Sequence, residues 1–165
     1  TTVCPTELRA LQADKEKFDG LNTVVLPISV DSAEDHQEWE PHLLSFGGQD
    51  IANFDFNWLE DPSGKLSKYF GIYDEAGKVS YRAAILIDPA NKIQSLTVYD
   101  NSISRTNEET LRVIAALQTA REDGGVCPYG WKEGDDTIAE EPEYVLEKDR
   151  KAGEEAKSEE VETSE

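Results

Sequence analysis

The feature that most constrains this sequence lies at its start, where Pro5 directly follows Cys4 and a helical pattern follows Pro5. In that pattern Leu8, Leu11 and Phe18 fall near one face. Proline is favoured in the first turn of a helix, where its missing N–H leaves no partner unsatisfied. The pattern predicts Cys4 at or just before a helix N-terminus, where backbone N–H groups and the helix dipole favour a reactive thiolate. For this dipeptide alone, a buried and inert cysteine is an equal alternative.

The net charge of the chain limits the classes of molecule that it can bind. Its 165 residues include 16 basic and 35 acidic side chains, which gives a net charge of −19. A surface of this sign repels nucleic acid phosphates and anionic membranes, so neither is expected as a partner. Hydrophobic residues make up 38% of the chain, which is typical of a soluble globular protein, and the length favours one domain.

Targeting signals are the next constraint on where the protein works. No apolar run reaches the length of a membrane span, and the first residues do not form a signal or transit sequence. We therefore expect a cytoplasmic protein, with an organelle as the alternative if a targeting segment was lost. The sequence begins at Thr1 and contains no Met, which favours a fragment or a processed form.

The two cysteines, Cys4 and Cys127, leave three possibilities. They are too few for a structural zinc site, and His36 and His42 offer no recognisable ligand spacing with them. No metal or other cofactor is therefore expected. The cysteines form a structural disulfide, are two unrelated thiols, or act as a redox pair, and the lack of a secretory signal disfavours the first.

Four helices are expected along the chain. They are the Cys4 helix, a short helix over 34–39 that Pro41 disturbs, a helix over 65–70, and a long helix that the Thr106–Glu109 capping box opens. Residues 126–131 are expected to be irregular, which suits a mobile thiol.

Strands are expected between these helices. Residues 23–30 predict a buried strand, although Pro27 favours an edge or a bulge there, and Phe54, Phe56 and Trp58 alternate as a strand face does. Residues 81–87 and 93–99 predict an antiparallel hairpin. The order predicts an α/β fold with a mixed sheet over residues 1–138. Residues 139–165 form an acidic tail whose composition predicts disorder.

Three segments, taken together, resemble one known family. They are Thr1-x-x-Cys4-Pro5-Thr6-Glu7, the segment 81–89 (Tyr-Arg-Ala-Ala-Ile-Leu-Ile-Asp-Pro), and the segment 126–132 (Val-Cys-Pro-Tyr-Gly-Trp-Lys). In this order the chain is similar, over roughly residues 1–138, to the typical two-cysteine peroxiredoxins of the alkyl hydroperoxide reductase C and thiol-specific antioxidant family. The resemblance implies a thioredoxin-like fold, a mixed central sheet flanked by helices, and reduction of hydrogen peroxide, organic hydroperoxides or peroxynitrite.

The resemblance also implies roles for single residues. Cys4 matches the peroxidatic cysteine, and Cys127 matches the resolving cysteine, which attacks from the other subunit of a head-to-tail homodimer. A thioredoxin-like dithiol then reduces the disulfide, and the family often builds rings of five dimers. The other matches are Thr1 and Arg82, which contact the sulfur and the peroxide; Glu7 and Arg105, which orient Arg82; and Trp39, which lies near the site.

The chemistry gives independent reasons for these residue types. A permanent cation such as Arg82 stabilises the Cys4 thiolate, and donors aimed at the departing oxygen stabilise the transition state as the O–O bond breaks. A carboxylate such as Glu7 fixes an arginine by bidentate pairing. Taken singly, each residue also has an ordinary interpretation: a strand-edge charge, an acidic residue in a first helical turn, or, for Arg105, a surface cation.

The sequence departs from the family pattern in several places. The family has a proline and strands upstream of Thr1, so the resemblance implies that the N-terminal strands are missing and that sheet edges are exposed. Thr2 replaces an aromatic residue. Peroxide-sensitive members carry a Gly-Gly-Leu-Gly loop and a C-terminal Tyr-Phe pair, whereas here Gly47-Gly48 continues as Gln49-Asp50 and Tyr144 precedes Val145. The last two departures, in the loop and in the C-terminal pair, predict a form whose Cys4 helix opens easily and which resists overoxidation of Cys4.

Two other functions compete with a thiol peroxidase. A non-catalytic oligomer, acting as a holdase or a redox-signalling scaffold, would suit the acidic tail and would tolerate loss of Cys4. A thioredoxin-type oxidoreductase is disfavoured, because Cys4 has no partner in Cys-x-x-Cys spacing.

Overall fold

The computed structural model describes residues 2–139, so Thr1 and nearly all of the predicted acidic tail lie outside the described residues. Helices and strands alternate along this part of the chain, which confirms the α/β class. The elements are α1 (Cys4–Ala13), α2 (Lys15–Gly20), β1 (Ile28–Ser29), α3 (Ala33–Ser45), the 3₁₀ helix η1 (Phe46–Gly48), β2 (Leu59–Glu60), α4 (Lys65–Tyr69), β3 (Tyr73–Asp74), β4 (Val79–Ser80), β5 (Arg82–Ile87), β6 (Ile93–Tyr99) and α5 (Asn107–Asp123).

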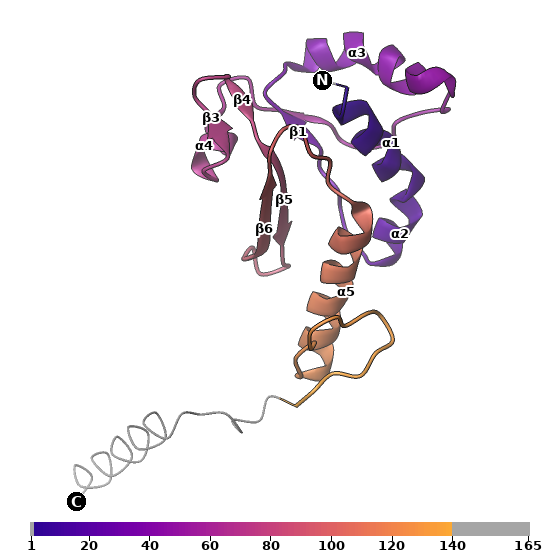
Figure 1. The fold of residues 1–165 in the computed structure, drawn as a ribbon, viewed down its shortest axis with the longest axis vertical. Coiled ribbons are helices and arrows are strands. Elements are labelled where there is room, and N and C mark those ends of the chain that lie inside the picture. Colours follow the sequence, from indigo (N-terminus) through magenta and orange to yellow (C-terminus); the bar gives the residue numbers. More distant parts are fainter. Residues whose placement is uncertain (1, 140–165) are drawn as a thin grey trace, which may run out of the picture.

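Figure 1 shows how these elements are arranged around the hairpin of β5 and β6. Helices α1, α2 and α3 lie on one side of the hairpin, and α4 with β3 and β4 lies on the other. Helix α5 leads away from this region and carries the segment after residue 123 to the end of the molecule opposite α3. No helix within residues 2–139 is long and apolar enough to cross a membrane.

The strands pair two by two, in parallel and antiparallel senses. β1 runs parallel to β2, while β3 pairs with β4 and β5 with β6 in antiparallel register. The β5–β6 hairpin confirms the prediction for residues 81–99: Arg82 lies opposite Tyr99, and the register shifts once near Leu86. Asp88 organises the connection, because its carboxylate accepts the backbone N–H groups of Ala90 and Lys92 at 2.8 and 2.9 Å.

The buried strand predicted over residues 23–30 is wrong for most of its length. Only Ile28 and Ser29 are in a strand, and Val24 is 80% exposed. Pro27 explains where pairing starts, since a proline has no N–H to give to a ladder. Its carbonyl accepts the N–H of Leu59 at 2.8 Å, and the ladder with β2 follows from there.

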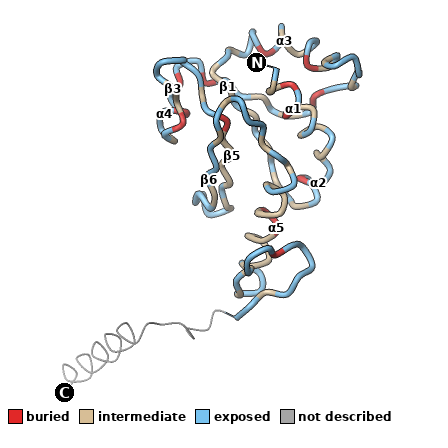
Figure 2. Tube along the Cα trace, viewed as in Figure 1, coloured by how far each residue is buried: buried red, intermediate tan, exposed pale blue. Residues whose placement is uncertain are grey.

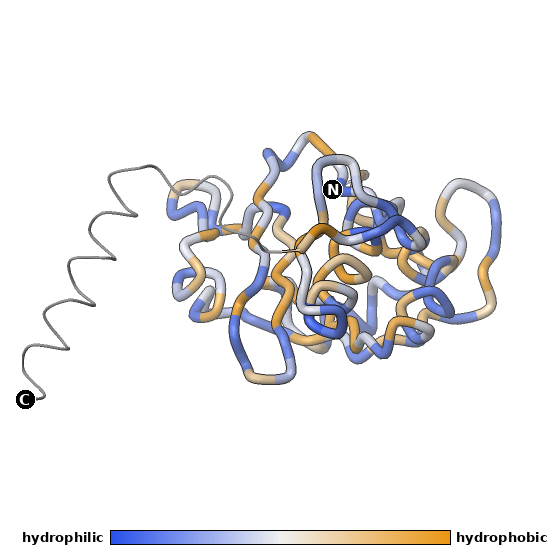
Figure 3. Tube along the Cα trace, turned by 90° about the horizontal axis from the view of Figure 1, so that it is seen from below, coloured by the Kyte–Doolittle hydropathy of each residue, from blue (hydrophilic) through white to orange (hydrophobic). Residues whose placement is uncertain are grey.

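Helix α1 begins where the sequence predicts it. Val3 is the N-cap, Cys4 is the first helical residue, and Pro5 lies in the first turn. Figure 2 shows buried stretches on α1 and α3, separated by exposed positions. In Figure 3, hydrophobic and hydrophilic stretches likewise alternate along the chain.

Helix α3 is longer than the predicted segment 34–39 and contains Pro41 in its interior. Ser32 opens it with a capping box, in which its hydroxyl accepts the N–H of Asp35 while the Asp35 carboxylate accepts the N–H of Ser32. A proline inside a helix costs about 3 kcal/mol. The capping box and the fully buried side chain of Leu43 offset that cost.

Two further local predictions are wrong. Thr106 is the N-cap of α5, but its side chain makes no capping hydrogen bond, and the Glu109 carboxylate, which would complete the box, pairs with Arg112 at 2.7 Å. Phe54, Phe56 and Trp58 do not form a strand face. Their rings pack against one another, with centroid distances of 5.1 Å (Phe54 to Phe56) and 5.5 Å (Phe54 to Trp58).

Asp61 sets the start of α4, and its removal gives the first testable prediction. Its carboxylate is 5% exposed and accepts the N–H of Leu66 and both the N–H and the hydroxyl of Ser67. We expect Asp61→Ala to lower the free energy of unfolding by about 1–3 kcal/mol, since buried donors lose their acceptor. Urea denaturation measures this free energy. The control is Asp100→Ala, because Asp100 is exposed and its carboxylate accepts the N–H of Ser102 at 2.8 Å. If Asp61→Ala lowered the free energy of unfolding no more than Asp100→Ala does, the prediction would be contradicted.

Candidate active site

The site is built around the carboxylate of Glu7, which α1 carries one turn after Cys4. The Glu7 side chain is 7% exposed, and its Oε2 accepts Arg82 Nη1 and Arg105 Nη2, each at 2.8 Å. Its Oε1 accepts the backbone N–H of Arg105 at 2.6 Å and Arg105 Nε at 3.1 Å. One carboxylate therefore joins two arginines that lie far apart in the sequence.

Arg82 connects this carboxylate to the sulfur of Cys4. It is the first residue of β5 and is 6% exposed. Its Nη1 donates to Glu7 and lies 3.4 Å from Cys4 Sγ, while its Nε donates to the carbonyl of Asn101 at 2.9 Å. The planar guanidinium is held on two sides, and its orientation toward the sulfur is fixed before any substrate arrives.

The charged groups in this cluster shift one another's pKa values. Burial alone would raise the pKa of Glu7, but the hydrogen bonds and charge of Arg105 and the charge of Arg82 outweigh it and hold the pKa below its ordinary value. Burial alone would lower the pKa of Arg82, but Cys4 and Glu7 raise it overall. The site therefore holds an ionised carboxylate and a permanent cation beside the sulfur.

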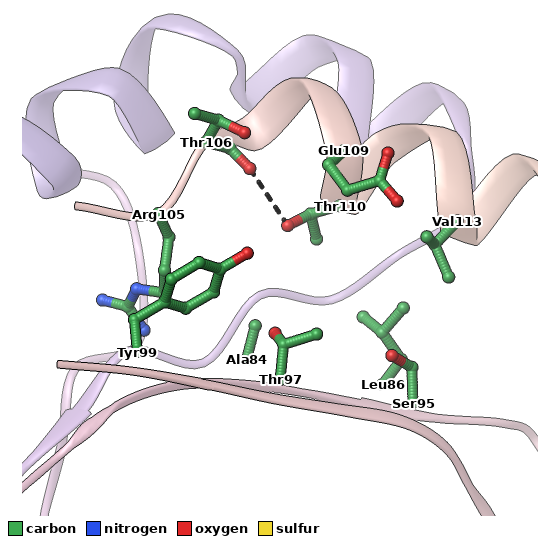
Figure 4. A pocket seen from close by; sticks show the side chains of 10 residues that line it. All are labelled: Ala84, Leu86, Ser95, Thr97, Tyr99, Arg105, Thr106, Glu109, Thr110 and Val113. Carbon is green, nitrogen blue, oxygen red and sulfur yellow. Dashed lines mark hydrogen bonds between the residues drawn. The ribbon is translucent and has the colours of Figure 1, made fainter. Parts of the chain in front are cut away.

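Arg105 closes the cluster from the loop before α5. Its Nη1 also donates to the carbonyl of Ala83 in β5. Figure 4 shows a small pocket on this side, between β5–β6 and α5. Its lining is rich in hydroxyls and includes Arg105, Thr106, Thr110 and Thr97 but not Cys4. The pocket therefore adjoins the arginine cluster and is separate from the sulfur.

Cys127 lies in a different part of the molecule. Its Sγ lies 3.5 Å from the carbonyl of Ala116 in α5, and the neighbouring Val126 pairs with Ile138. Trp131 anchors the same segment: it is 2% exposed and its Nε1 donates to the carbonyl of Asp135. In Figure 1 this segment and the N-terminus of α1 lie at opposite ends of the described chain, so a single folded subunit does not bring the two thiols together.

The structure thus brings four of the six sequence-predicted site residues together: Cys4, Glu7, Arg82 and Arg105. Thr1 lies outside the described residues. Trp39 is on α3, where its ring contacts those of His42 and Trp58 at 5.6 and 5.8 Å. Within residues 2–139, no three His, Cys, Asp or Glu side chains come together to hold a metal ion.

Sequence reasoning missed two supports of the site. The carbonyl of Asn101 accepts from Arg82, and no sequence motif signals a backbone acceptor of this kind. Asp14, at the end of α1, accepts the side-chain amide of Asn107 at 2.9 Å and so ties α1 to the start of α5. The sequence does indicate a turn at residues 100–102 and a helix start near residue 107. Neither signal indicates that Asn101 binds Arg82 or that Asn107 binds Asp14.

Comparisons with known proteins identify the family of the chain. The model of the AhpC/TSA family matches residues 1–96, and that of the C-terminal domain of 1-Cys peroxiredoxin matches residues 116–151. Peroxiredoxin prdx-2 of Caenorhabditis elegans is 36% identical over 84% of this chain and 68% of its own length. Thioredoxin peroxidase of Fasciola hepatica is 36% identical over 87% of this chain and 73% of its own.

Solved structures give the same result. The reduced 2-Cys peroxiredoxin of Plasmodium vivax superposes with a TM-score of 0.77 at 35% identity, covering 83% of this chain and 69% of that one. The fold and the site together define a thiol peroxidase of thioredoxin-like architecture. The chain belongs to the AhpC/TSA family, the peroxiredoxins.

Proposed function

We propose that Cys4 is the peroxidatic cysteine of this thiol peroxidase and that hydrogen peroxide and organic hydroperoxides are its substrates. The observation that carries the proposal is the contact between Cys4 Sγ and Arg82, at 3.4 Å, at the first residue of a helix. A guanidinium and a helix N-terminus both favour the thiolate, which is the nucleophilic form.

The reaction follows from this placement. The Cys4 thiolate attacks one peroxide oxygen, the O–O bond breaks, and the sulfur becomes a sulfenic acid while the other oxygen leaves as water or an alcohol. Negative charge develops on the leaving oxygen, and the N–H groups of Arg82 are donors already oriented toward that region. Glu7 and Arg105 keep Arg82 in place, and we propose that the Thr1 hydroxyl supplies a further donor.

Regeneration needs a second thiol. We propose that Cys127 of a partner subunit attacks the sulfenic acid, which forms a disulfide and releases water. The separation of the two thiols within one subunit supports a homodimer for this step. A thioredoxin-like dithiol then reduces the disulfide by exchange. Analytical ultracentrifugation distinguishes a dimer from a ring of five dimers.

A thiol cycle of this kind needs a reducing compartment, so we propose the cytoplasm or a reducing organelle.

The test of this function is peroxide consumption coupled to thioredoxin and its reductase. We expect the chain to turn over peroxide and Cys4→Ser to abolish it, because no other thiolate lies beside Arg82. Cys127→Ser is expected to remove thioredoxin-dependent turnover but to leave one equivalent of Cys4 oxidation, seen as a sulfenic acid by dimedone trapping. Equal turnover in the unaltered chain and in Cys4→Ser would reject the proposal. A complete lack of peroxide consumption by the unaltered chain would also reject it and would favour a scaffold.

A further inference from the structure

Arg9 makes contacts that the peroxidase chemistry does not explain. Its guanidinium donates to three backbone carbonyls: those of Leu43 at 3.1 Å, Leu44 at 3.0 Å and Gln49 at 2.6 Å. Leu43 and Leu44 are in the last turn of α3, where the helix dipole favours a cation, and their carbonyls also accept the backbone N–H groups of Phe46 and Ile51. Gln49 follows η1. One side chain of α1 therefore binds both the end of α3 and the segment after it.

A second contact lies on the same face of α1. Gln12, three residues after Arg9, accepts the backbone N–H of Asp55 through its Oε1 at 2.7 Å. Glu7, in contrast, is two residues before Arg9, about 200° around the helix, and faces the two arginines. Helix α1 is thus fixed by charged groups on opposite faces, the active site on one and the Arg9 contacts on the other.

These contacts matter because Cys4 must move to meet Cys127. The first turn of α1 is closed by the N–H groups of Thr6 and Glu7, which both donate to the carbonyl of Val3. A helix terminus opens at low cost when little else holds it. Arg9 lies in the next turn and is half-buried, so its three hydrogen bonds oppose any opening that spreads beyond the first turn.

We propose that Arg9 is a positioning residue that holds α1 closed and thereby sets how the Cys4 sulfenic acid is divided between two fates. In one, the thiol of Cys127 attacks the sulfur, a disulfide forms, and the sulfenic oxygen leaves as water. In the other, a second peroxide molecule oxidises the sulfenic acid to a sulfinic acid and is itself reduced to water or an alcohol. The first requires α1 to open and the second does not. This inference rests on the proposed function.

The variant that tests it is Arg9→Met, which keeps the aliphatic stem and removes every donor. Hydrogen exchange of the reduced protein is expected to be about tenfold faster in α1 and unchanged in β5–β6 and α5, because losing a charge-assisted hydrogen bond shifts an opening equilibrium by roughly that factor. Under graded peroxide, intact mass is expected to show at least about threefold less sulfinic acid on Cys4 than in the unaltered chain. Arg9→Lys, which keeps a donor, is expected to fall between them.

Arg121→Met is the matched control, since Arg121 is half-exposed and has an ion pair of 3.8 Å with Asp88 away from α1. It is expected to change neither exchange in α1 nor the sulfinic fraction. Unchanged exchange in Arg9→Met overturns the proposal, and so does faster exchange with an unchanged sulfinic fraction. Faster exchange in every element indicates general destabilisation and also overturns it. A chain in which peroxide never oxidises Cys4 rejects the proposed function, while exchange still decides whether Arg9 holds α1 closed.

Discussion

Replacing Arg82 with Lys is expected to slow the reaction of Cys4 with peroxide about a hundredfold. Arg82 contacts three groups at once: the sulfur of Cys4, the carboxylate of Glu7 and the carbonyl of Asn101. Lys keeps the charge but has no planar fork, so it cannot hold these contacts together. Removing one oriented donor from a developing oxyanion commonly costs 10²–10³ in rate, and about a hundredfold is the lower part of that range.

The quantity to measure is the second-order rate constant of Cys4 oxidation, by stopped-flow competition with a peroxidase of known rate. This constant reports binding and the transition state before resolution by Cys127 begins. Arg121→Lys makes the same chemical change at a half-exposed position and is expected to stay within about twofold of the unaltered chain. If Arg82→Lys also stayed within about threefold, the guanidinium would have no special part in the reaction.

Sequence reasoning succeeded where the signal is local. The start of α1 depends on a cysteine followed by a proline, and the β5–β6 hairpin depends on two apolar runs around Asp88. It failed where a distant or competing partner decides the outcome. Glu109 is placed to close a capping box with Thr106, but its carboxylate is bound by Arg112 instead. The sequence predicts a short helix over 34–39 that Pro41 disturbs, but α3 continues past Pro41 to Ser45, and Leu43 is fully buried there.

The site shows the same limit more sharply. Arg82 lies 75 positions after Glu7 in the sequence, and Arg105 lies 98 positions after it. No periodicity links the three residues. Taken singly, each had an ordinary interpretation, and the family resemblance was needed to group them. Arg9 was not identified at all, because its partners are backbone carbonyls, which every residue has. Which carbonyls a guanidinium reaches is a property of packing.

Replacing Glu7 with Gln is expected to lower the free energy of unfolding by about 3–5 kcal/mol at neutral pH. The carboxylate is 7% exposed and is the shared counter-charge of Arg82 and Arg105. Gln keeps the shape but leaves one buried and one half-buried cation without it, and breaking a buried ion pair in this way costs that much. Glu109→Gln removes a carboxylate that is 56% exposed and pairs with Arg112, so a loss of about 0–1 kcal/mol is expected there.

The pH dependence of this difference provides a second, independent check. Because the two arginines hold the pKa of Glu7 below its ordinary value, the folded protein binds this proton less readily than the unfolded chain does. The stabilisation is therefore complete above the unfolded pKa of about 4.3 and is lost as the pH falls through the lower folded pKa. Urea denaturation from pH 7 downward is expected to show a constant gap between the chain and Glu7→Gln, which narrows below about pH 4.3. A gap that widens with acid would mean that burial, and not the arginines, governs this carboxyl.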